Sequence, residues 1–145
     1  KYSVDKQWNP AIEAYQKAVS IKSTNYWNYH GLAMVYMARN QSGDLEQAEK
    51  ISKIANSLSP DRAESYFSLG QIAQKRGNPQ GAVNQFQEAI QRDTTNKWYY
   101  LGLGDAYLQL GNKSFAQKAY QSVLRLEPGN ESARRALASI NSKGK

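Results

Sequence analysis

Apolar residues recur along the chain in short segments in which they lie three or four positions apart, the spacing of one face of an α-helix. Ala82, Phe86 and Ala89 show this spacing, and Ala116 and Tyr120 show it again further along. Segments rich in Asn, Gly, Pro and Ser lie between these stretches and are typical of turns. The pattern predicts eight helices, at about residues 9–22, 26–40, 44–58, 61–76, 79–92, 97–110, 113–126 and 131–142.

Asparagines mark several of the expected helix starts. In Asn9-Pro10 and in Asn78-Pro79 a capping side chain precedes a proline, a residue that suits the first position of a helix. The same capping role is predicted for Asn25, Asn96 and Asn130. Two glycines can close the preceding helices in a left-handed conformation: Gly77 and Gly111.

A set of landmarks recurs at a spacing of 34 residues. Tyr66 and Gly70 reappear as Tyr100 and Gly104. Three further series have the same spacing: Ala48, Ala82 and Ala116; Ala55, Ala89 and Val123; Pro60, Thr94 and Pro128. An internal repeat of this length indicates similar units that each bury an apolar face against their neighbours.

These landmarks resemble the tetratricopeptide repeat. That family has a large aromatic, Leu-Gly and Tyr on a first helix, and Ala, an aromatic, Ala and Pro on a second. The resemblance covers almost the whole chain. It implies an all-α fold, a right-handed α-solenoid of antiparallel helix pairs, in which small residues let the two helices of a unit approach closely.

The units differ in how well they match the family pattern. Residues 97–130 match nearly every position. Residues 63–96 have Ala73 in place of the first-helix Tyr and Thr94 in place of the closing Pro.

The unit at residues 26–62 has Ser52 where the second-helix aromatic is expected. It is also three residues longer than the other two units, and we expect the extra residues around 40–43, between its helices.

The two ends are expected to be incomplete units. Residues 1–25 resemble a partial first repeat with only its second helix, and Tyr2 stands where the Tyr of the preceding first helix would be. This truncation would leave apolar surface around Tyr15 unprotected, which favours self-association. Residues 131–145 are expected to form a capping helix and tail. In this helix, arginines alternate with apolar residues: Arg134 and Arg135 with Ala133, Leu137 and Ile140.

Composition narrows the functional classes. The net charge is +7, and from residue 97 onward eight Lys/Arg stand against three Asp/Glu. The charge is scattered rather than concentrated in one run, so nucleic acid binding is not the favoured reading. The chain has no cysteine, which removes disulfides and thiolate metal sites. No apolar run is long enough to span a bilayer. The sequence does not determine a compartment, although a soluble, cytoplasmic location is slightly favoured.

A search for catalytic chemistry finds no candidate. His30 is the only histidine, and a lone His on a helix is usually a polar or packing residue. The glycines of Gly102-Leu103-Gly104 lie within a helix and not after a strand, so they do not form a phosphate loop. We therefore expect no enzymatic activity, no cofactor, no metal site and no small-molecule substrate.

The resemblance implies that the first helices line a concave groove that takes peptides. Gly31, Ser68 and Gly102 form a row of small residues there, which would leave room for a ligand backbone. The residues predicted to contact a partner are Trp27, His30, Met34, Met37, Phe67, Gln71, Lys75, Trp98, Leu101, Asp105, Leu108 and Arg135. For the two tryptophans, packing between helices is as well supported as binding.

Three hypotheses remain. The first is a protein-interaction module that binds a peptide or helix in a largely apolar groove, with Lys75 and Arg135 helping at one end. A chaperone-tail adaptor is disfavoured, because no cationic clamp occupies the groove positions. The second is a structural segment of a longer solenoid that oligomerises through its truncated N-terminal repeat. The third, RNA binding through the basic C-terminal third, is the least favoured.

Overall fold

The computed structural model describes the backbone of residues 2–143 and the side chains of residues 7–142. Within that range the chain forms eight helices and no strand: α1 (Tyr2–Ile21), α2 (Tyr26–Arg39), α3 (Asp44–Leu58), α4 (Ala63–Lys75), α5 (Pro79–Arg92), α6 (Lys97–Gln109), α7 (Lys113–Leu126) and α8 (Glu131–Lys143). The observed helix bounds follow the predicted ones closely from α2 onward.

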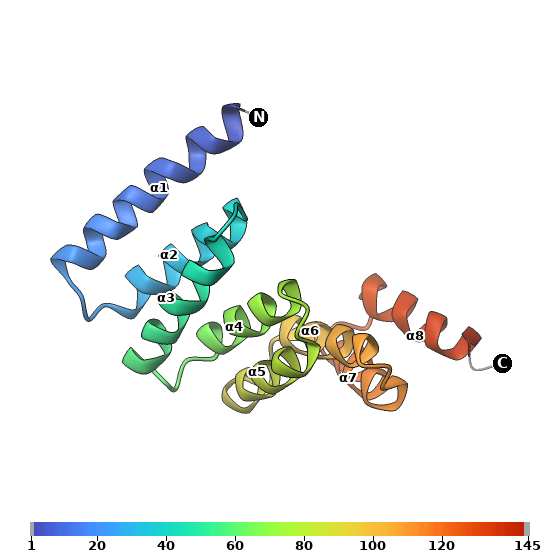
Figure 1. The fold of residues 1–145 in the computed structure, drawn as a ribbon. Coiled ribbons are helices and arrows are strands. Elements are labelled where there is room, and N and C mark those ends of the chain that lie inside the picture. Colours follow the sequence, from blue (N-terminus) through green and yellow to red (C-terminus); the bar gives the residue numbers. More distant parts are fainter. Residues whose placement is uncertain (1, 144–145) are drawn as a thin grey trace.

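The helices form a row of hairpins that runs from the N-terminal to the C-terminal end of the molecule (Figure 1). Each helix packs mainly against the helices before and after it in the sequence. The first helices of the units also touch one another, α2 with α4 and α4 with α6. Contacts limited to near neighbours define a solenoid, so the predicted all-α repeat architecture is confirmed.

Most of the predicted caps are present. The side-chain oxygens of Asn25, Asn78 and Asn96 accept hydrogen bonds from the backbone N–H groups that open α2, α5 and α6, at 2.9 to 3.0 Å. Gly77 and Gly111 have φ angles of 74° and 77°, the left-handed conformation expected after α4 and α6. These groups satisfy backbone donors and acceptors that a helix leaves free at its ends.

The predicted start of the first helix at Asn9-Pro10 is wrong. Helix α1 runs without interruption from Tyr2 to Ile21, with Pro10 inside it. Asn9 does not cap a helix, and its Oδ1 accepts a hydrogen bond from Nη1 of Arg39 on α2, at 2.8 Å. Pro10 removes one intrahelical hydrogen bond and crowds the preceding turn, and the packing of α1 against α2 offsets this cost. Tyr2, expected on a separate helix, is the first residue of α1, and its side chain lies outside the described residues.

Small residues and aromatic rings fit together along the core. Phe86 on α5 is completely buried, and it lies against Gly70 of its own unit and Gly102 of the next. A Cβ atom at Gly70 would lie 2.6 Å from the Phe86 ring, and one at Gly102 would lie 2.7 Å from it. Tyr120 packs against Gly104 in the same way. The predicted role of these glycines in close helix packing is confirmed.

The three extra residues of the first full unit are not concentrated in the loop at residues 40–43. Compared with the next unit, α2 has 14 residues against 13 in α4, and α3 has 15 against 14 in α5. The intervening loop has four residues against three. Each segment therefore absorbs one residue, which lengthens the hairpin while the shared core positions stay in register.

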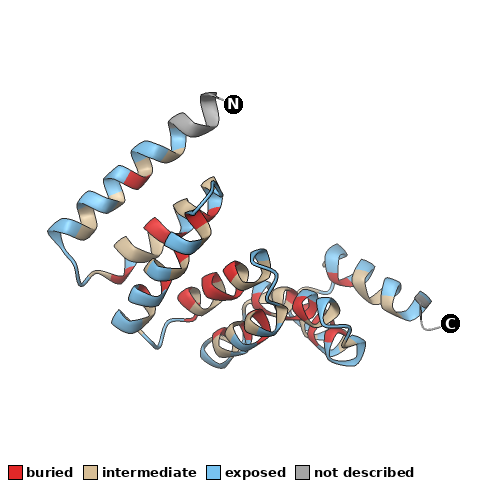
Figure 2. Cartoon of the chain, viewed as in Figure 1, coloured by how far each residue is buried: buried red, intermediate tan, exposed pale blue. Residues whose placement is uncertain are grey.

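Helix α8 closes the C-terminal end as expected. Ala133 is buried, and Leu137 and Ile140 pack against the cluster formed by α6 and α7, while Arg134 and Arg135 are exposed. At the other end, α1 contacts α2 and has few fully buried residues, which Figure 2 shows as a mostly pale blue and tan helix. None of the described helices combines the length and apolar character required to cross a bilayer.

Candidate partner-binding groove

A hollow of about 250 Å³ lies between the first helices α4 and α6. Its lining comes from four helices: Phe67, Gln71 and Gln74 on α4, Phe86 on α5, Trp98, Leu101, Gly102 and Asp105 on α6, and Ser132 on α8. We call this hollow the α4–α6 groove. Its members on first helices lie three or four positions apart on one helix face, which is why neighbouring units present them together.

The apolar wall of the groove is built from packed rings. Phe67 is half-buried, and its ring centroid lies 5.6 Å from that of Phe86 and 5.0 Å from that of Tyr99. Trp98 differs from these residues because its side chain is 57% exposed. The wall is therefore rigid where it is buried and offers one large free aromatic surface at its edge.

Asp105 supplies the charge of the groove. It is the only ionisable residue in the described lining, and it accepts a hydrogen bond from the hydroxyl of the buried Tyr120. Burial raises the pKa of Asp105, and the hydrogen bond from Tyr120 opposes this shift. Burial of the Tyr120 hydroxyl, together with the carboxylate of Asp105, raises the pKa of Tyr120, so that its hydroxyl stays protonated and remains a donor.

Two glutamines provide the other polar groups. Gln74 donates through Nε2 to the carbonyl of Gly102 at 3.3 Å, which ties α4 to α6. Gln71 has a buried Oε1 that accepts no hydrogen bond from the described residues. A buried acceptor without a donor costs free energy, so a turn of the Gln71 side chain that brings this oxygen to a ligand donor in the groove would be favourable.

The predicted residues on α2 form a separate aromatic group. His30 stacks on Tyr26 with ring centroids 5.5 Å apart, and Trp27 meets both rings edge-on. The guanidinium of Arg62 lies over Trp27, 4.7 Å from its ring centroid. Burial lowers the pKa of His30, and the nearby Glu64 opposes this shift. Met34 is exposed, and its sulfur accepts a hydrogen bond from Ser68 Oγ at 3.5 Å.

Two of the predicted contact residues are buried. Met37 is only 7% exposed and packs with Ala48 and Ile72, so it belongs to the core and not to a binding surface. Leu101 is also buried, although one side of it still borders the α4–α6 groove. Helical spacing alone placed both on the concave face, but contacts with the adjacent second helix or the next unit cover them.

Three other predicted residues do not line the groove. Leu108 is half-buried against the cluster of α7 and α8. Lys75 and Arg135 are exposed, and Arg135 pairs with Glu131 one turn away at 3.1 Å.

The row of small residues serves packing and does not leave room for a ligand. The space above Gly31 is filled by the ring of Tyr15, to which a Cβ atom would approach within 2.4 Å. Phe86 fills the space at Gly102 in the same way, and Ser68 is buried. The interpretation of this row as a site for a ligand backbone is therefore wrong, because the second helix of the preceding unit already occupies that position at two of its members.

Comparisons with known proteins agree with this architecture. A family model of the tetratricopeptide repeat matches residues 73–140. A TPR repeat-containing protein of Methanocaldococcus jannaschii is 29% identical over 140 residues, which is 90% of this chain and 24% of that protein. The chain belongs to the tetratricopeptide repeat family.

The solved crystal structure of MamA superposes on this tetratricopeptide repeat chain with a TM-score of 0.86 and 26% identity. The match covers 97% of this chain and 81% of MamA. Tetratricopeptide repeats are scaffolds for protein–protein interaction and are generally not enzymes. One relative, a protein O-mannosyl-transferase of Homo sapiens, is 25% identical over 134 residues, but this chain spans only 14% of its length.

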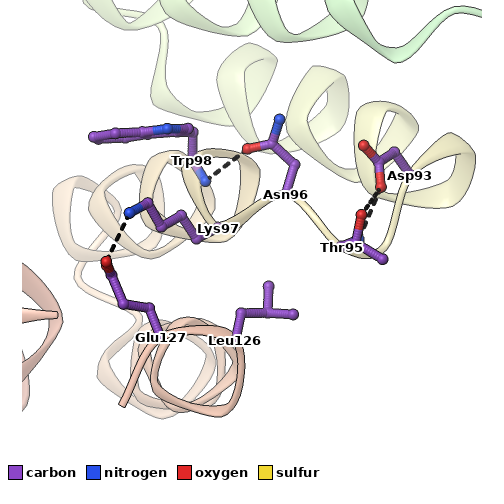
Figure 3. Close-up of a pocket in the computed structure, with 7 residues that line it drawn as sticks. All are labelled: Asp93, Thr95, Asn96, Lys97, Trp98, Leu126 and Glu127. Atoms are coloured by element: carbon purple, nitrogen blue, oxygen red, sulfur yellow. Dashed lines mark hydrogen bonds and ion pairs between the residues drawn. The ribbon is translucent and has the colours of Figure 1, made fainter. Parts of the chain in front are cut away.

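A second hollow, of about 460 Å³, lies at the edge of the repeat array beside the loop between α5 and α6 (Figure 3). Its polar residues bond to one another: Lys97 pairs with Glu127 at 2.9 Å, and Thr95 donates to Asp93. The ion pair with Lys97 and the hydrogen bond from Asn130 lower the pKa of Glu127. We call this hollow the loop pocket.

The loop pocket shares Trp98 with the α4–α6 groove. Although it is the larger of the two, we favour the groove as the binding site of this tetratricopeptide repeat chain. The polar groups of the loop pocket are used in caps and ion pairs that hold the loop. The groove instead contains a buried amide oxygen without a donor and a carboxylate that forms no ion pair with the described residues. Among the described residues no cluster of His, Cys, Asp or Glu could hold a metal ion.

Proposed function

We propose that this chain is a protein-interaction module that holds a peptide or helix of a partner protein in the α4–α6 groove, as part of a larger protein. The observation that carries the proposal is the exposed face of Trp98 at the edge of an otherwise buried aromatic wall. A partly exposed tryptophan beside a hollow is the kind of residue that dominates binding energies at interfaces.

The physical argument concerns what a partner would remove from water. An aromatic side chain buries about 150–250 Å² when it is fully covered. Each Å² of apolar surface removed from water contributes ~25 cal/mol of favourable free energy. Phe67 and Phe86 are already fixed by their neighbours, so a ligand would lose little free energy in ordering them.

The test uses a phage-displayed library of random 12-residue peptides, selected on the purified chain and then measured by titration calorimetry. The decisive variants are Trp98→Ala, which alters the groove and the loop pocket, and Leu126→Ala, which alters the loop pocket and leaves the groove lining unchanged. We expect Trp98→Ala to weaken the selected peptides about 30-fold, as for a hot-spot residue, and Leu126→Ala to leave their affinity unchanged.

The results separate the two sites because neither exchanged side chain belongs to the buried core: Trp98 is 57% exposed and Leu126 is 41% exposed. Equal losses in the two variants would place binding in the loop pocket. Peptides that bind Trp98→Ala as well as the wild-type chain would overturn the groove assignment.

A second candidate function is self-association through α1. This helix contacts α2 on one side, and its last residue, Ile21, is 76% exposed. If α1 mediates assembly, light scattering will show a concentration-dependent mass that Ile21→Glu reduces to that of the monomer. A monomer at all concentrations would rule out this candidate.

A further inference from the structure

The α4–α6 groove contains two acceptor groups at equivalent positions of consecutive units. Gln71 and Asp105 are 34 residues apart, one repeat length, and both line the groove. Residues at equivalent positions of stacked first helices lie side by side along the solenoid. The two side chains therefore belong to the same groove, at equivalent places in consecutive units.

Neither acceptor is fully used within the described part of the chain. Gln71 Oε1 is buried and has no hydrogen-bond donor. Asp105 accepts through Oδ1 from Tyr120, and no lysine or arginine among the described residues pairs with it. This contrasts with Asp44, Glu49 and Glu127, each of which forms an ion pair in a chain whose net charge is +7.

The groove therefore lacks a donor with positive charge. A purely apolar ligand would bury Asp105 further without giving it a charged partner, which costs free energy. It would also leave Gln71 Oε1 as unsatisfied as it is in the free chain. A carboxylate ligand would be repelled. A ligand that combines an apolar stem with several N–H donors would instead lie along Phe67 and Trp98 and reach both acceptors.

We propose that the α4–α6 groove recognises an arginine side chain in the partner segment. This inference rests on the proposed peptide-binding function of the same groove. A guanidinium carries five N–H donors in a planar fork, so one arginine can donate to the carboxylate of Asp105 and, once the Gln71 side chain turns its buried amide oxygen toward the groove, to that oxygen as well. Its aliphatic stem and flat head suit an aromatic wall, because arginine packs on aromatic faces. Lysine, a point charge, would serve one acceptor better than two.

The test uses the peptides selected from the random 12-residue library. We expect arginine to be enriched at one fixed position among them. Replacement of that arginine by citrulline, which keeps the shape and loses the charge, should weaken binding by about tenfold. Replacement by lysine should cost less than citrulline but remain measurable.

The protein variants test the acceptors directly. Asp105→Asn keeps an acceptor for the Tyr120 hydroxyl, so the fold is retained, and it should weaken the arginine peptide about tenfold while changing the citrulline peptide little. Gln71→Glu should strengthen the arginine peptide about threefold. Asp61→Asn removes the same charge from an exposed residue outside the groove and should have no effect.

The outcomes distinguish this inference from the function on which it rests. If the peptides require Trp98 but show no arginine preference, and Asp105→Asn binds them as tightly as the wild type, arginine recognition is wrong and the peptide-binding groove stands. If no peptide is selected, or if selected peptides ignore Trp98→Ala, both proposals fail together.

Discussion

The two junctions between the full units of this solenoid are filled in different ways. Between the second and third units, the ring of Phe86 lies between Gly70 and Gly102 and is completely buried. At the equivalent position of the first unit, 34 residues earlier, stands Ser52, which is 1% exposed and whose Oγ has no hydrogen-bond partner among the described residues.

The difference extends to the residues around these positions. The positions equivalent to Gly70 and Gly102 hold Ala33 and Ser68, which carry side chains. Met37 packs into the neighbouring core. The first junction therefore uses several small and flexible side chains where the second uses one ring. A shared repeat length determines where a junction lies, but the fit of its side chains determines how stable it is.

The largest expected effect is at the aromatic junction. Phe86→Ala removes a fully buried ring from two glycine surfaces that cannot move in to fill the space, and we expect it to cost about 4 kcal/mol of unfolding free energy. Guanidinium denaturation followed by circular dichroism measures the loss. A loss below about 1 kcal/mol would mean that the ring is not the main contact of this junction.

The second prediction concerns the hairpin loop of the first unit. Asp44 is buried and accepts hydrogen bonds from Arg39 at 2.6 and 2.8 Å and from the backbone N–H of Gln41. The equivalent residues, Asn78 and Asn112, are neutral caps. We expect Asp44→Asn to cost about 3 kcal/mol, because it replaces the buried carboxylate that faces the Arg39 guanidinium by a neutral amide. Glu46→Gln, in an exposed ion pair of the same helix, should cost under about 0.5 kcal/mol.

The pH dependence of stability checks the same pair independently. Hydrogen bonds from Arg39 hold the pKa of Asp44 below its ordinary value of 3.8. A lowered folded-state pKa means that the stabilisation is complete above the unfolded-state pKa. It is then lost as the pH falls from about 4 through the folded-state value. The wild type should lose stability over this window more steeply than Asp44→Asn; parallel curves would contradict the assignment.

The smallest expected effect is at the serine junction. Ser52→Ala removes a buried hydroxyl without a partner and creates little empty space, so we expect a change within about 1 kcal/mol, in the stabilising direction. Thermal unfolding of Ser52→Ala beside Phe86→Ala gives the comparison within one experiment. A large destabilisation by Ser52→Ala would reveal a hydrogen bond that this junction depends on.

Much of the fold could be predicted from spacing because each unit repeats the same arrangement of caps, turns and apolar positions. The asparagine caps, the left-handed glycines and the helix bounds from α2 onward depend on neighbouring residues, and they were predicted correctly. The start of α1 was not, because Asn9-Pro10 has the local features of a helix start. Its actual role depends on Arg39, which lies 30 residues away.

The candidate groove was predicted less well than the fold. Phe67, Gln71, Trp98, Leu101 and Asp105 do line one hollow, as helical spacing indicates. Spacing could not reveal that Met37 is buried, or that Tyr15 and Phe86 occupy the space above Gly31 and Gly102, since these contacts join different units. The acceptor pair was also missed, although the 34-residue interval between Gln71 and Asp105 was a signal that could have found it.

The amino-acid sequence by itself determined the repeat, the all-α fold class and the family, because these follow from local helix chemistry and from a period that is visible along the chain. Only the tertiary structure decided which apolar side chains are free and which polar groups lack partners. Exposure and hydrogen bonding depend on which side chains of neighbouring helices contact each position. The linear pattern of residues does not give the distance between two side chains in different units.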